Sequence, residues 1–487
     1  MSSVTSTGAT RSPVRRSCSL FGIATISCSM GFLIPVSAAL STPTKDATSV
    51  APVGLISLRR ESVPVQRKGQ VVAFKTSYSG TIHVGSPEPQ EFRVVFDTGS
   101  GHVVLPSVKC SSAVCLQHRR FDATASASSA VVNTDGSLVS EGAEGDRVTI
   151  GYGTGKVTGE LVRERVCLGP AAQTLPRGEA NSSGPAVDVA RAATTCATVH
   201  TVAATELSAN PFSLFSFDGI VGLGLRDLSL SREFNFLDLL GRSGGAASSS
   251  FGIFLSEGHD GEESELAVGG HNPERLLSPL TWSPAIRPEL GYWQVQVKAV
   301  HIGDHFTLPL CQDGSCRGVI DTGTSHLGVP APHLKTLQEM LTVAVTDTQD
   351  CRGAEAPDIK IELPGFNLTL TPDDYMRRLP LREDVGVGSW RGMADQLLSR
   401  VGLGWAGSQP SGGEFAQHCR PRLMPVRLPE PIGPNVFILG EPVLHHYYTV
   451  FDWAAPRIGF GLANSRRQAA ALRGGGGEAA GGAPLSQ

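Results

Sequence analysis

The sequence predicts a mainly β protein with short helices, built as two related halves. The first observation is that two short stretches have the same form, VVFDTGS at residues 94–100 and GVIDTGT at residues 318–324. The second is composition: glycine and proline are abundant, only 18% of the residues are charged, and no heptad or short repeat occurs in the 487 residues. The two stretches are the only internal repeat, and this indicates a duplicated β domain.

Each repeated stretch begins with an apolar run and ends in an aspartate. The runs before Asp97 and Asp321 have the composition of buried strands, and the glycine two residues after each aspartate indicates a tight turn. Each strand therefore presents one carboxylate on a sharp loop. If the two loops face each other, the two carboxylates lie side by side.

Such a pair of carboxylates has a recognised chemistry. Two carboxylates a few ångströms apart share a proton, because ionising both is costly. The charged member can act as general base on a water and the protonated member as general acid on a carbonyl. The pair suits direct hydrolysis of a peptide bond, with no cofactor or metal. Chance is the alternative: a single Asp-Thr-Gly is expected in about one chain in ten of this length. Two copies behind apolar strands are not.

At these residues the chain resembles the pepsin-like aspartic peptidases, the eukaryotic type that includes pepsin and cathepsin D. Members have a bilobal fold, with two β lobes around a central cleft and one catalytic aspartate in each lobe. The resemblance implies that Asp97 and Asp321 are catalytic. It also assigns Ser100 and Thr324 to hydrogen bonds with the outer carboxylate oxygens.

Four further residues of the two loops are assigned to support of the aspartates. The resemblance implies that Thr98 and Thr322 brace the two loops against each other beneath the aspartates. Gly99 and Gly323 let the backbones bring the carboxylates together.

The segment at 148–155, VTIGYGTG, lies where the family has its flap, a mobile hairpin that closes over substrate. Tyr152 takes the place of the flap tyrosine, and Gly153 and Thr154 follow it. As a bare motif the segment is also compatible with an ordinary hairpin turn. The family commonly has a tryptophan that hydrogen-bonds this tyrosine, and Val104 occupies that position here. The tyrosine is therefore expected to find another partner.

Two pairs of features follow the two aspartates. Residues 217–224 and 437–440 resemble the family segments that pass beside each aspartate loop, where glycine allows a close approach. His102 and His326 each lie five residues after an aspartate. They either tune protonation in the cleft or form local hydrogen bonds at strand ends.

The chain contains ten cysteines, two of them in the first 38 residues. The other eight form an even set, which suits disulfides in an oxidising compartment. No cysteine or histidine cluster has zinc spacing, so no metal is expected. With the resemblance in view, the expected pairs are Cys110–Cys115, Cys311–Cys316, Cys351–Cys419 and, as a further candidate, Cys167–Cys196.

An apolar stretch at residues 20–40 follows three arginines and ends near the small residues Val36, Ser37 and Ala38. We interpret residues 1–38 as a cleaved signal peptide. The stretch is also long enough to be a retained anchor, and only then would the protein contact a membrane. In both interpretations the chain enters the secretory pathway.

The remaining boundaries follow from composition and from the resemblance. Residues 39–70 are basic and partly apolar, like the propeptide that family zymogens place over the acidic cleft; a solvated linker is the alternative. The N-terminal lobe is expected at 71–285 and the C-terminal lobe at 286–463. The Gly/Ala-rich tail at 464–487 is expected to be disordered.

Two insertions are expected on the surface, at 170–195 and 377–418. Asn181 and Asn367 lie in glycosylation sequons.

The sequence thus predicts a monomeric aspartic endopeptidase of the secretory pathway, active on proteins or peptides at acidic pH. It acts outside the cell or in a lysosome-like or vacuole-like compartment. The net charge of −4, without a basic run beyond the N-terminal region, gives no indication of nucleic-acid binding. The alternative function is a catalytically silent homologue that binds peptides or a protein partner.

Overall fold

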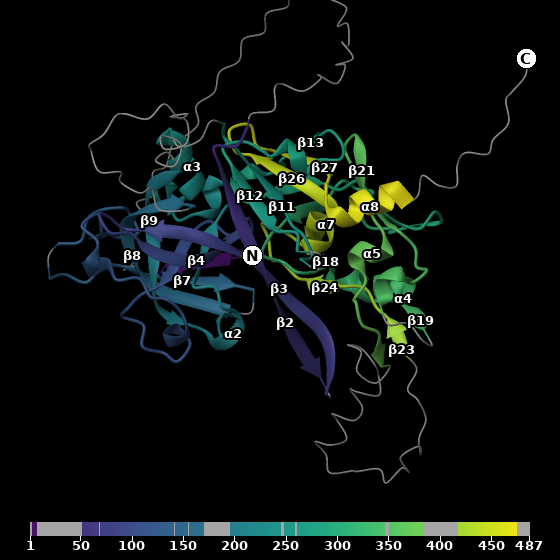
Figure 1. Ribbon diagram of the computed structural model, residues 1–487, viewed down its shortest axis with the longest axis horizontal. Coiled ribbons are helices and arrows are strands. Elements are labelled where there is room, and N and C mark those ends of the chain that lie inside the picture. The colour runs from purple at the N-terminus through teal and green to yellow at the C-terminus, as the bar shows by residue number, and fades with distance from the viewer. Residues whose placement is uncertain are drawn as a thin grey trace, which may run out of the picture.

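The computed structural model describes residues 2–6, 51–67, 69–140, 142–153, 155–169, 195–244, 248–258, 261–345, 350–382 and 417–474. The fold is mainly β, as the sequence predicts, and it is of the bilobal pepsin-like type. Figure 1 shows the first half of the chain, purple to teal, on one side and the second half, green to yellow, on the other. The predicted signal peptide, apart from residues 2–6, lies outside the described residues.

One fifteen-stranded sheet runs through the first half and includes strands from the chain's end. In pairing order its strands are β1 (Ser2–Ser6), β7 (Arg147–Tyr152), β8 (Gly155–Leu168), β9 (Cys196–Leu207), β5 (Val103–Pro106), β10 (Gly219–Gly222), β4 (Gln90–Asp97), β3 (Gln70–Val84), β2 (Gly54–Arg67), β12 (Ser264–Val268), β11 (Ser250–Phe254), β26 (Tyr447–Asp452), β27 (Arg457–Leu462) and β13 (Thr281–Pro284), with β6 (Ala130–Val131) beside β8. The antiparallel pairing of β11 with β26 joins the two halves of the chain in one sheet.

The second half contributes three smaller sheets. The first orders β14 (Gln294–Gln296), β17 (Arg317–Ile320), β25 (Val436–Leu439), β18 (Leu327–Pro330) and β24 (Leu423–Val426). The second orders β16 (Phe306–Thr307), β15 (Ala299–Ile302), β20 (Ile359–Leu363) and β21 (Phe366–Leu370), and the third β19 (Val343–Val345), β23 (Gln417–Cys419) and β22 (Leu381–Arg382).

The helices are short and lie between strands. The α-helices are α2 (Ala209–Phe212), α3 (Phe236–Arg242), α4 (Leu334–Leu341), α5 (Pro372–Tyr375), α7 (Glu441–His446) and α8 (Arg466–Gly474). The 3-10 helices are η1 (Cys115–Gln117), η2 (Ala123–Ala125), η3 (Arg226–Leu228), η4 (Arg232–Phe234), η5 (Pro273–Arg275), η6 (Pro288–Leu290), η7 (Ala331–His333) and η8 (Cys351–Gly353). Local chemistry sets their ends and faces. The Asn235 side chain accepts the Asp238 N–H and starts α3, while Leu337 and Leu341 bury one face of α4.

Helix α8 corrects one expectation from the sequence. The tail at 464–487 is predicted to be disordered, and this is wrong for Arg466–Gly474, which forms a helix. Tertiary contacts explain the difference: Arg467 pairs with Glu257 at 3.2 Å and also with Asp373. The Gln468 side chain donates to the carbonyl of His446 at 2.9 Å. Composition alone cannot reveal these partners, which lie far away in the sequence. None of the helices in the described ranges is both long and apolar enough to span a bilayer.

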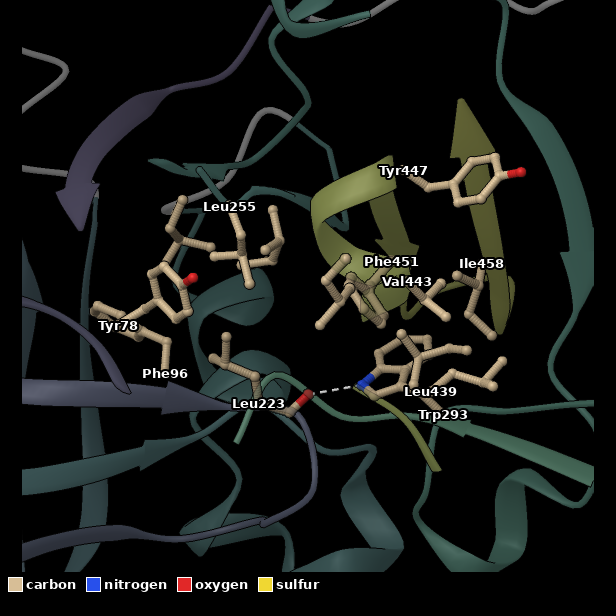
Figure 2. Close-up of a cluster of buried hydrophobic side chains, with 14 of the residues drawn as sticks. Tyr78, Phe96, Leu223, Leu255, Trp293, Leu439, Val443, Tyr447, Phe451 and Ile458 are labelled. Atoms are coloured by element: carbon tan, nitrogen blue, oxygen red, sulfur yellow. Dashed lines mark hydrogen bonds between the residues drawn. The ribbon is translucent and has the colours of Figure 1, made fainter. Parts of the chain in front are cut away.

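A cluster of buried side chains holds the two halves together (Figure 2). Trp293 is fully buried, and its ring lies against Phe451 at 5.2 Å and Phe251 at 6.1 Å between centroids. Its indole Nε1–H donates to the carbonyl of Leu223 at 2.7 Å. The backbone N–H of Leu223 in turn donates to the carbonyl of Asp97 at 2.8 Å. Trp293 therefore ties the second half of the chain to the loop of the first aspartate.

Replacing Trp293 by phenylalanine is expected to lower the free energy of unfolding by about 1–3 kcal/mol. The ring volume is largely kept, but the buried carbonyl of Leu223 loses its indole donor. Urea unfolding followed by circular dichroism measures the effect. Trp453→Phe is the matched control, because Trp453 is partly exposed and no side-chain hydrogen bond of it is found among the described residues. Equal losses in the two variants would contradict the role given to the indole hydrogen bond.

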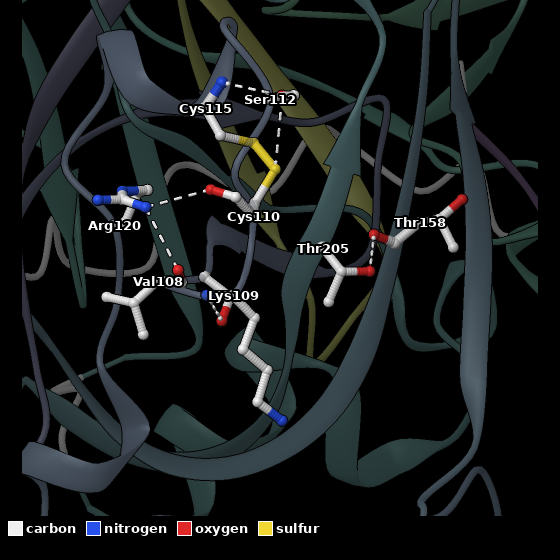
Figure 3. The surroundings of a disulfide bond; sticks show 9 residues. Val108, Lys109, Cys110, Ser112, Cys115, Arg120, Thr158 and Thr205 are labelled. Carbon is white, nitrogen blue, oxygen red and sulfur yellow. Dashed lines mark hydrogen bonds between the residues drawn. A yellow bond between two sulfur atoms is a disulfide. The ribbon is translucent and has the colours of Figure 1, made fainter.

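All four predicted disulfides are present: Cys110–Cys115, Cys167–Cys196, Cys311–Cys316 and Cys351–Cys419. Figure 3 shows the small loop closed by Cys110–Cys115, where the Cys115 N–H donates to Ser112 Oγ at 3.2 Å. The Arg120 guanidinium donates to the carbonyls of Val108 and Cys110 at 3.3 and 3.2 Å. Four disulfides fit a protein of an oxidising compartment.

Candidate active site

Both aspartates stand at the ends of central strands. Asp97 is the last residue of β4, and β10 runs parallel beside it with Gly222 opposite Asp97. Asp321 directly follows β17, and β25 runs parallel to that strand with Leu439 opposite Ile320. The two half-sites therefore have the same topology, and the segments at 217–224 and 437–440 lie beside the two loops, as predicted from the resemblance.

The glycines that end these neighbouring segments are needed for close approach. A Cβ on Gly222 would lie 2.5 Å from the backbone nitrogen of His102, and a Cβ on Gly440 would lie 2.2 Å from the carbonyl oxygen of Thr324. Neither distance is possible for a real side chain. A glycine at each position thus allows the neighbouring segment to fix the aspartate loop.

The two aspartate loops face each other in close contact, so that the glycine of each loop packs on the carboxylate of the other. A Cβ on Gly99 would lie 2.9 Å from both carboxylate oxygens of Asp321, and a Cβ on Gly323 would lie 2.7 Å from Oδ1 of Asp97. Any larger residue would push the carboxylates apart. The structure brings Asp97 and Asp321 together, 224 residues apart in the chain.

Two threonines hold the loops in this position. The Thr98 N–H donates to Thr322 Oγ1, and the Thr322 N–H donates to Thr98 Oγ1, both at 3.0 Å. Each hydroxyl then donates across the interface, from Thr98 to the carbonyl of Ile320 at 2.9 Å and from Thr322 to the carbonyl of Phe96 at 2.7 Å. This reciprocal arrangement fixes the separation of the two aspartates.

The carboxylates accept hydrogen bonds from their own loops. Asp97 Oδ1 accepts from the N–H of Gly99 at 2.9 Å, and Asp321 Oδ1 accepts from the N–H of Gly323 at 2.8 Å. The Thr324 hydroxyl donates to Asp321 Oδ2 at 2.9 Å. The Ser100 hydroxyl lies close enough to Asp97 to lower its pKa, but it is buried without a hydrogen bond of good geometry among the described residues. The two halves of the site therefore differ at this position.

Burial and the charge of Asp321 raise the pKa of Asp97. Asp321 is 1% exposed and Asp97 is partly exposed. Burial, followed by the charge of Asp321, raises the pKa of Asp97 to about 6. Tyr292 lies close enough to both aspartates to be affected by their charges. Its pKa is raised to about 12, mainly by burial and then by the charges of Asp321 and Asp97. We did not predict Tyr292 as a site residue, because nothing in its sequence context indicates that it lies near both aspartates.

Tyr152, the predicted flap residue, ends β7 and is buried. Its ring packs edge to face on Phe212 at 6.3 Å between centroids, in a cluster that includes Val104. Its hydroxyl has no hydrogen-bond partner among the described residues. Val104 fills the position by apolar packing, and the expectation that the hydroxyl finds another partner is wrong among the residues that the structure describes. Gly153 turns with a φ of 55°, and Thr154 lies outside the described residues.

Replacing Tyr152 by phenylalanine is expected to leave the free energy of unfolding unchanged or to raise it by about 1 kcal/mol, because it removes a buried hydroxyl without a partner. Tyr78→Phe is the matched control. The Tyr78 hydroxyl donates to Glu441 at 3.0 Å and contacts His445 Nε2 at 2.6 Å, so its loss should destabilise by about 1–3 kcal/mol. Thermal unfolding compares the two variants. A loss of stability in Tyr152→Phe equal to that in Tyr78→Phe would show that the Tyr152 hydroxyl has a partner.

The outer edge of the flap strand accepts an extended segment. Strand β1 pairs antiparallel with β7 through five residues, with Ser2 opposite Tyr152. In Figure 1 the N-terminal end lies at the centre of the molecule, next to β7. The edge of β7 therefore has the geometry for main-chain hydrogen bonds to an extended peptide.

The two histidines near the aspartates differ. His102 is fully buried, its Nε2 accepts the N–H of Leu230 at 3.0 Å, and burial lowers its pKa to about 4. The local hydrogen-bond interpretation is confirmed for this residue. His326 is partly buried and lies on the wall of a pocket; burial, then Arg377 and Arg422, lowers its pKa to about 3.

The remaining predicted sites are peripheral. Asn367 lies exposed on β21, where a glycan could be attached, and Asn181 lies outside the described residues. The insertion at 170–195 lies outside them except for its last residue, and the insertion at 377–418 is described only at its two ends. In the parts that the structure describes, no group of three or more acidic, histidine or cysteine side chains is arranged to hold a metal ion.

Two β lobes that each carry one Asp-Thr-Gly loop define the class of pepsin-like proteins. A family model described as eukaryotic aspartyl protease matches residues 77–183 and 185–384. The chain therefore belongs to the eukaryotic aspartyl protease family. It is 28% identical to cathepsin E of Mus musculus over 388 residues, which cover 78% of this chain and 79% of that protein. It is 29% identical to napsin-A of Mus musculus over 406 residues, covering 80% and 78% of the two chains, and 29% identical to gastricsin of Cavia porcellus over 392 residues, covering 80% of both.

Proposed function

We propose that this protein is an aspartic endopeptidase in which Asp97 and Asp321 activate a water for attack on a peptide bond. The reciprocal hydrogen bonds of Thr98 and Thr322 carry this proposal, because they hold two carboxylates at a fixed short separation. Family membership and the hydrogen bond from Thr324 to Asp321 support the same assignment.

The reaction follows from one shared proton. The ionised member of the pair takes a proton from the water, whose oxygen attacks the carbonyl carbon, and the protonated member gives its proton to the carbonyl oxygen. The tetrahedral intermediate then breaks its C–N bond as a proton passes to the leaving nitrogen. Because the pKa of Asp97 is raised to about 6, the pair keeps this proton at acidic pH and loses it above about pH 6.

Substrate binds along the flap as an extended strand in this proposal. The pairing of β1 with β7 supports it, since a peptide would make the same main-chain hydrogen bonds beside Tyr152.

Residues 39–70 are a propeptide in the same scheme. Arg60 of β2 pairs with Glu441 at 3.8 Å and donates to the Tyr78 hydroxyl at 3.3 Å.

The contact between Arg60 and Glu441 is expected to weaken only at a pH below the ordinary pKa of a glutamate. Burial acts to raise the pKa of Glu441, but His445, Arg422 and Arg60 together hold it below its ordinary value. A carboxylate with a lowered pKa keeps its stabilising contacts as the pH falls, until the pH reaches that lowered value. We propose a monomer that enters the secretory pathway and acts outside the cell or in an acidic compartment.

The proposal is tested by cleavage of denatured haemoglobin from pH 3 to pH 7, with and without a statine-type inhibitor, on protein that has been acid-treated. Activity should be inhibitor-sensitive, and kcat/KM should fall above about pH 6 as the shared proton is lost. Protein that binds the statine inhibitor but cleaves nothing at any pH would favour the catalytically silent alternative.

A further inference from the structure

A pocket of about 220 Å³ lies between the β2–β3 hairpin and the segment that follows α5. Thr76 and His326 are among its lining residues, and Ser325, which immediately precedes His326, ties it to the active site. The Thr76 N–H donates to Ser325 Oγ at 3.0 Å, and the Ser325 hydroxyl donates back to the Thr76 carbonyl at 3.0 Å. Ser325 lies only four residues after Asp321. The pocket therefore adjoins the loop of the second aspartate.

The pocket wall is strongly cationic. Its lining includes one carboxylate, Glu257, and five arginines: Arg60, Arg352, Arg377, Arg378 and Arg422. Glu257 is already engaged by Arg352, by Arg467 at 3.2 Å and by His445 at 3.8 Å. It cannot also neutralise the other guanidinium groups.

The other carboxylates nearby are shared in the same way. Glu441 lies 3.8 Å from Arg60 and 3.6 Å from Arg422, so one carboxylate serves two cations at long distances. Asp350 lies against Arg352 and, at 3.9 Å, Arg378. Among the described residues, four of the five guanidinium groups thus share three carboxylates, and Arg467 also pairs with one of these, Glu257.

Arg377 is the arginine of the pocket wall for which the described residues provide no carboxylate partner. Its Nη1 donates to the carbonyl of Val72, and no carboxylate of the described residues pairs with it. Burial, then the neighbouring charges of Arg422, Arg420 and Arg67, lowers its pKa to about 10. A partly buried cation surrounded by other cations is costly, and an anion in the pocket would relieve that cost.

The volume of the pocket is sufficient for one side chain. At roughly 30 Å³ for each water, its volume corresponds to about seven waters, which is room for an acidic side chain. The planar guanidinium of Arg377 can bind a carboxylate through two parallel hydrogen bonds. Arg60 and Ser62 of β2 lie within the proposed propeptide and leave the wall with it, whereas Arg377 and Arg422 lie outside it and remain.

We propose that this pocket binds the carboxylate of a substrate glutamate or aspartate, so that the protein selects peptides with an acidic side chain at one position. The inference rests on the proposed peptidase function, because it names the substrate class of that cleft. After removal of the proposed propeptide the pocket keeps the lining residues of β3, of residues 376–379 and Arg422, none of which belongs to the Asp-Thr-Gly loops.

The test uses statine-containing peptides, which bind but are not cleaved, on acid-treated protein expressed from its full chain. One glutamate is placed at a different position in each peptide, and every peptide has a glutamine counterpart. Fluorescence anisotropy at pH 5.5, where glutamate is ionised, measures the affinities. At one position the glutamate peptide should bind about tenfold tighter or more. At pH 3.5, where glutamate is largely protonated, the ratio should shrink.

Three variants locate the effect. Arg377→Gln should abolish the glutamate preference while the glutamine peptide binds as in the wild type, which also shows that the cleft is intact. Arg377→Lys keeps the charge and should retain part of the preference. Arg119→Gln is the control, because Arg119 is exposed and pairs with Glu91 at 2.6 Å away from the pocket; the full preference should remain.

The outcomes separate this inference from the proposed function. If neither member of any peptide pair binds, the peptidase proposal itself fails. If both members bind equally at every position, or if Arg377→Gln keeps the preference, the carboxylate-binding pocket is overturned, and the peptidase proposal is decided by haemoglobin cleavage alone.

Discussion

Replacing Asp97 by asparagine is expected to lower kcat/KM for denatured haemoglobin at least about a thousandfold, and Asp321→Asn should do the same. An amide cannot hold the shared proton that the pair needs, so neither the water nor the carbonyl oxygen is activated. The close contact of the two loops should persist, because the bonds between Thr98 and Thr322 do not involve the carboxylates.

Although Asp97→Asn should lower activity, it should raise the free energy of unfolding at pH 7. Burial, then Asp321, raises the pKa of Asp97 from 3.8 to about 6, so the folded protein binds more protons than the unfolded chain between these values. The free energy of unfolding of the wild type therefore falls as the pH rises from about 4 to about 6. Asparagine removes this penalty, and Asp97→Asn should be more stable at pH 7 by up to roughly 3 kcal/mol, with no gain at pH 3.

Activity assays and urea unfolding at the two pH values check both parts of this prediction. Asp304→Asn is the control, because the Asp304 side chain is 79% exposed and pairs with Lys360 at 3.1 Å instead of taking part in the aspartate pair. It should change neither activity nor the pH dependence of stability by a measurable amount. Full activity in Asp97→Asn would rule out the dyad, and a variant less stable than wild type at pH 7 would contradict the raised pKa.

Removing the disulfide Cys351–Cys419 by replacing both cysteines with alanine is expected to lower the free energy of unfolding by about 4 kcal/mol. The bridge closes a loop with a sequence separation of 68, and opening it restores much conformational freedom to the unfolded chain. Both cysteines are fully buried, so alanine avoids placing a hydroxyl in the core.

The small loop offers a matched control for this effect. Cys110–Cys115 has a separation of 5, and its cysteines are equally buried, so the corresponding double alanine variant should lose only about 2 kcal/mol. Urea unfolding of both variants without reductant measures the two losses. A loss for the long loop no greater than that for the short loop would contradict the loop-entropy explanation.

The two aspartate loops of this protein were predictable from short stretches of sequence. An apolar run that ends in Asp-Thr-Gly specifies a buried strand, a turn and the residue at the turn, all within about seven residues. These local features led to Asp97 and Asp321, and the resemblance then supplied Thr98 and Thr322 as braces. The same resemblance supplied three disulfide pairings, and the structure contains them.

Three features that depend on distant partners and that no motif marks were predicted wrongly or not at all. Helix α8 forms where composition predicted disorder, because Arg467 pairs with residues 210 and 94 positions earlier in the chain. Tyr292 lies near both aspartates, and no pattern around it shows this. The Tyr152 hydroxyl has no hydrogen-bond partner in the described part of the chain, where Val104 places an apolar side chain in the same cluster.

The sequence by itself determined the fold class and the two aspartate loops, because strand, turn and motif are encoded in neighbouring residues, whereas three of the cysteine pairs came from the family resemblance. Only the tertiary structure decided which charges meet. Arg60, Arg377 and Arg422 are spread over more than 360 residues of a chain with a net charge of −4, yet they line one pocket. The energy of a charge depends on its distance from other charges and on its burial, and chain folding alone sets both.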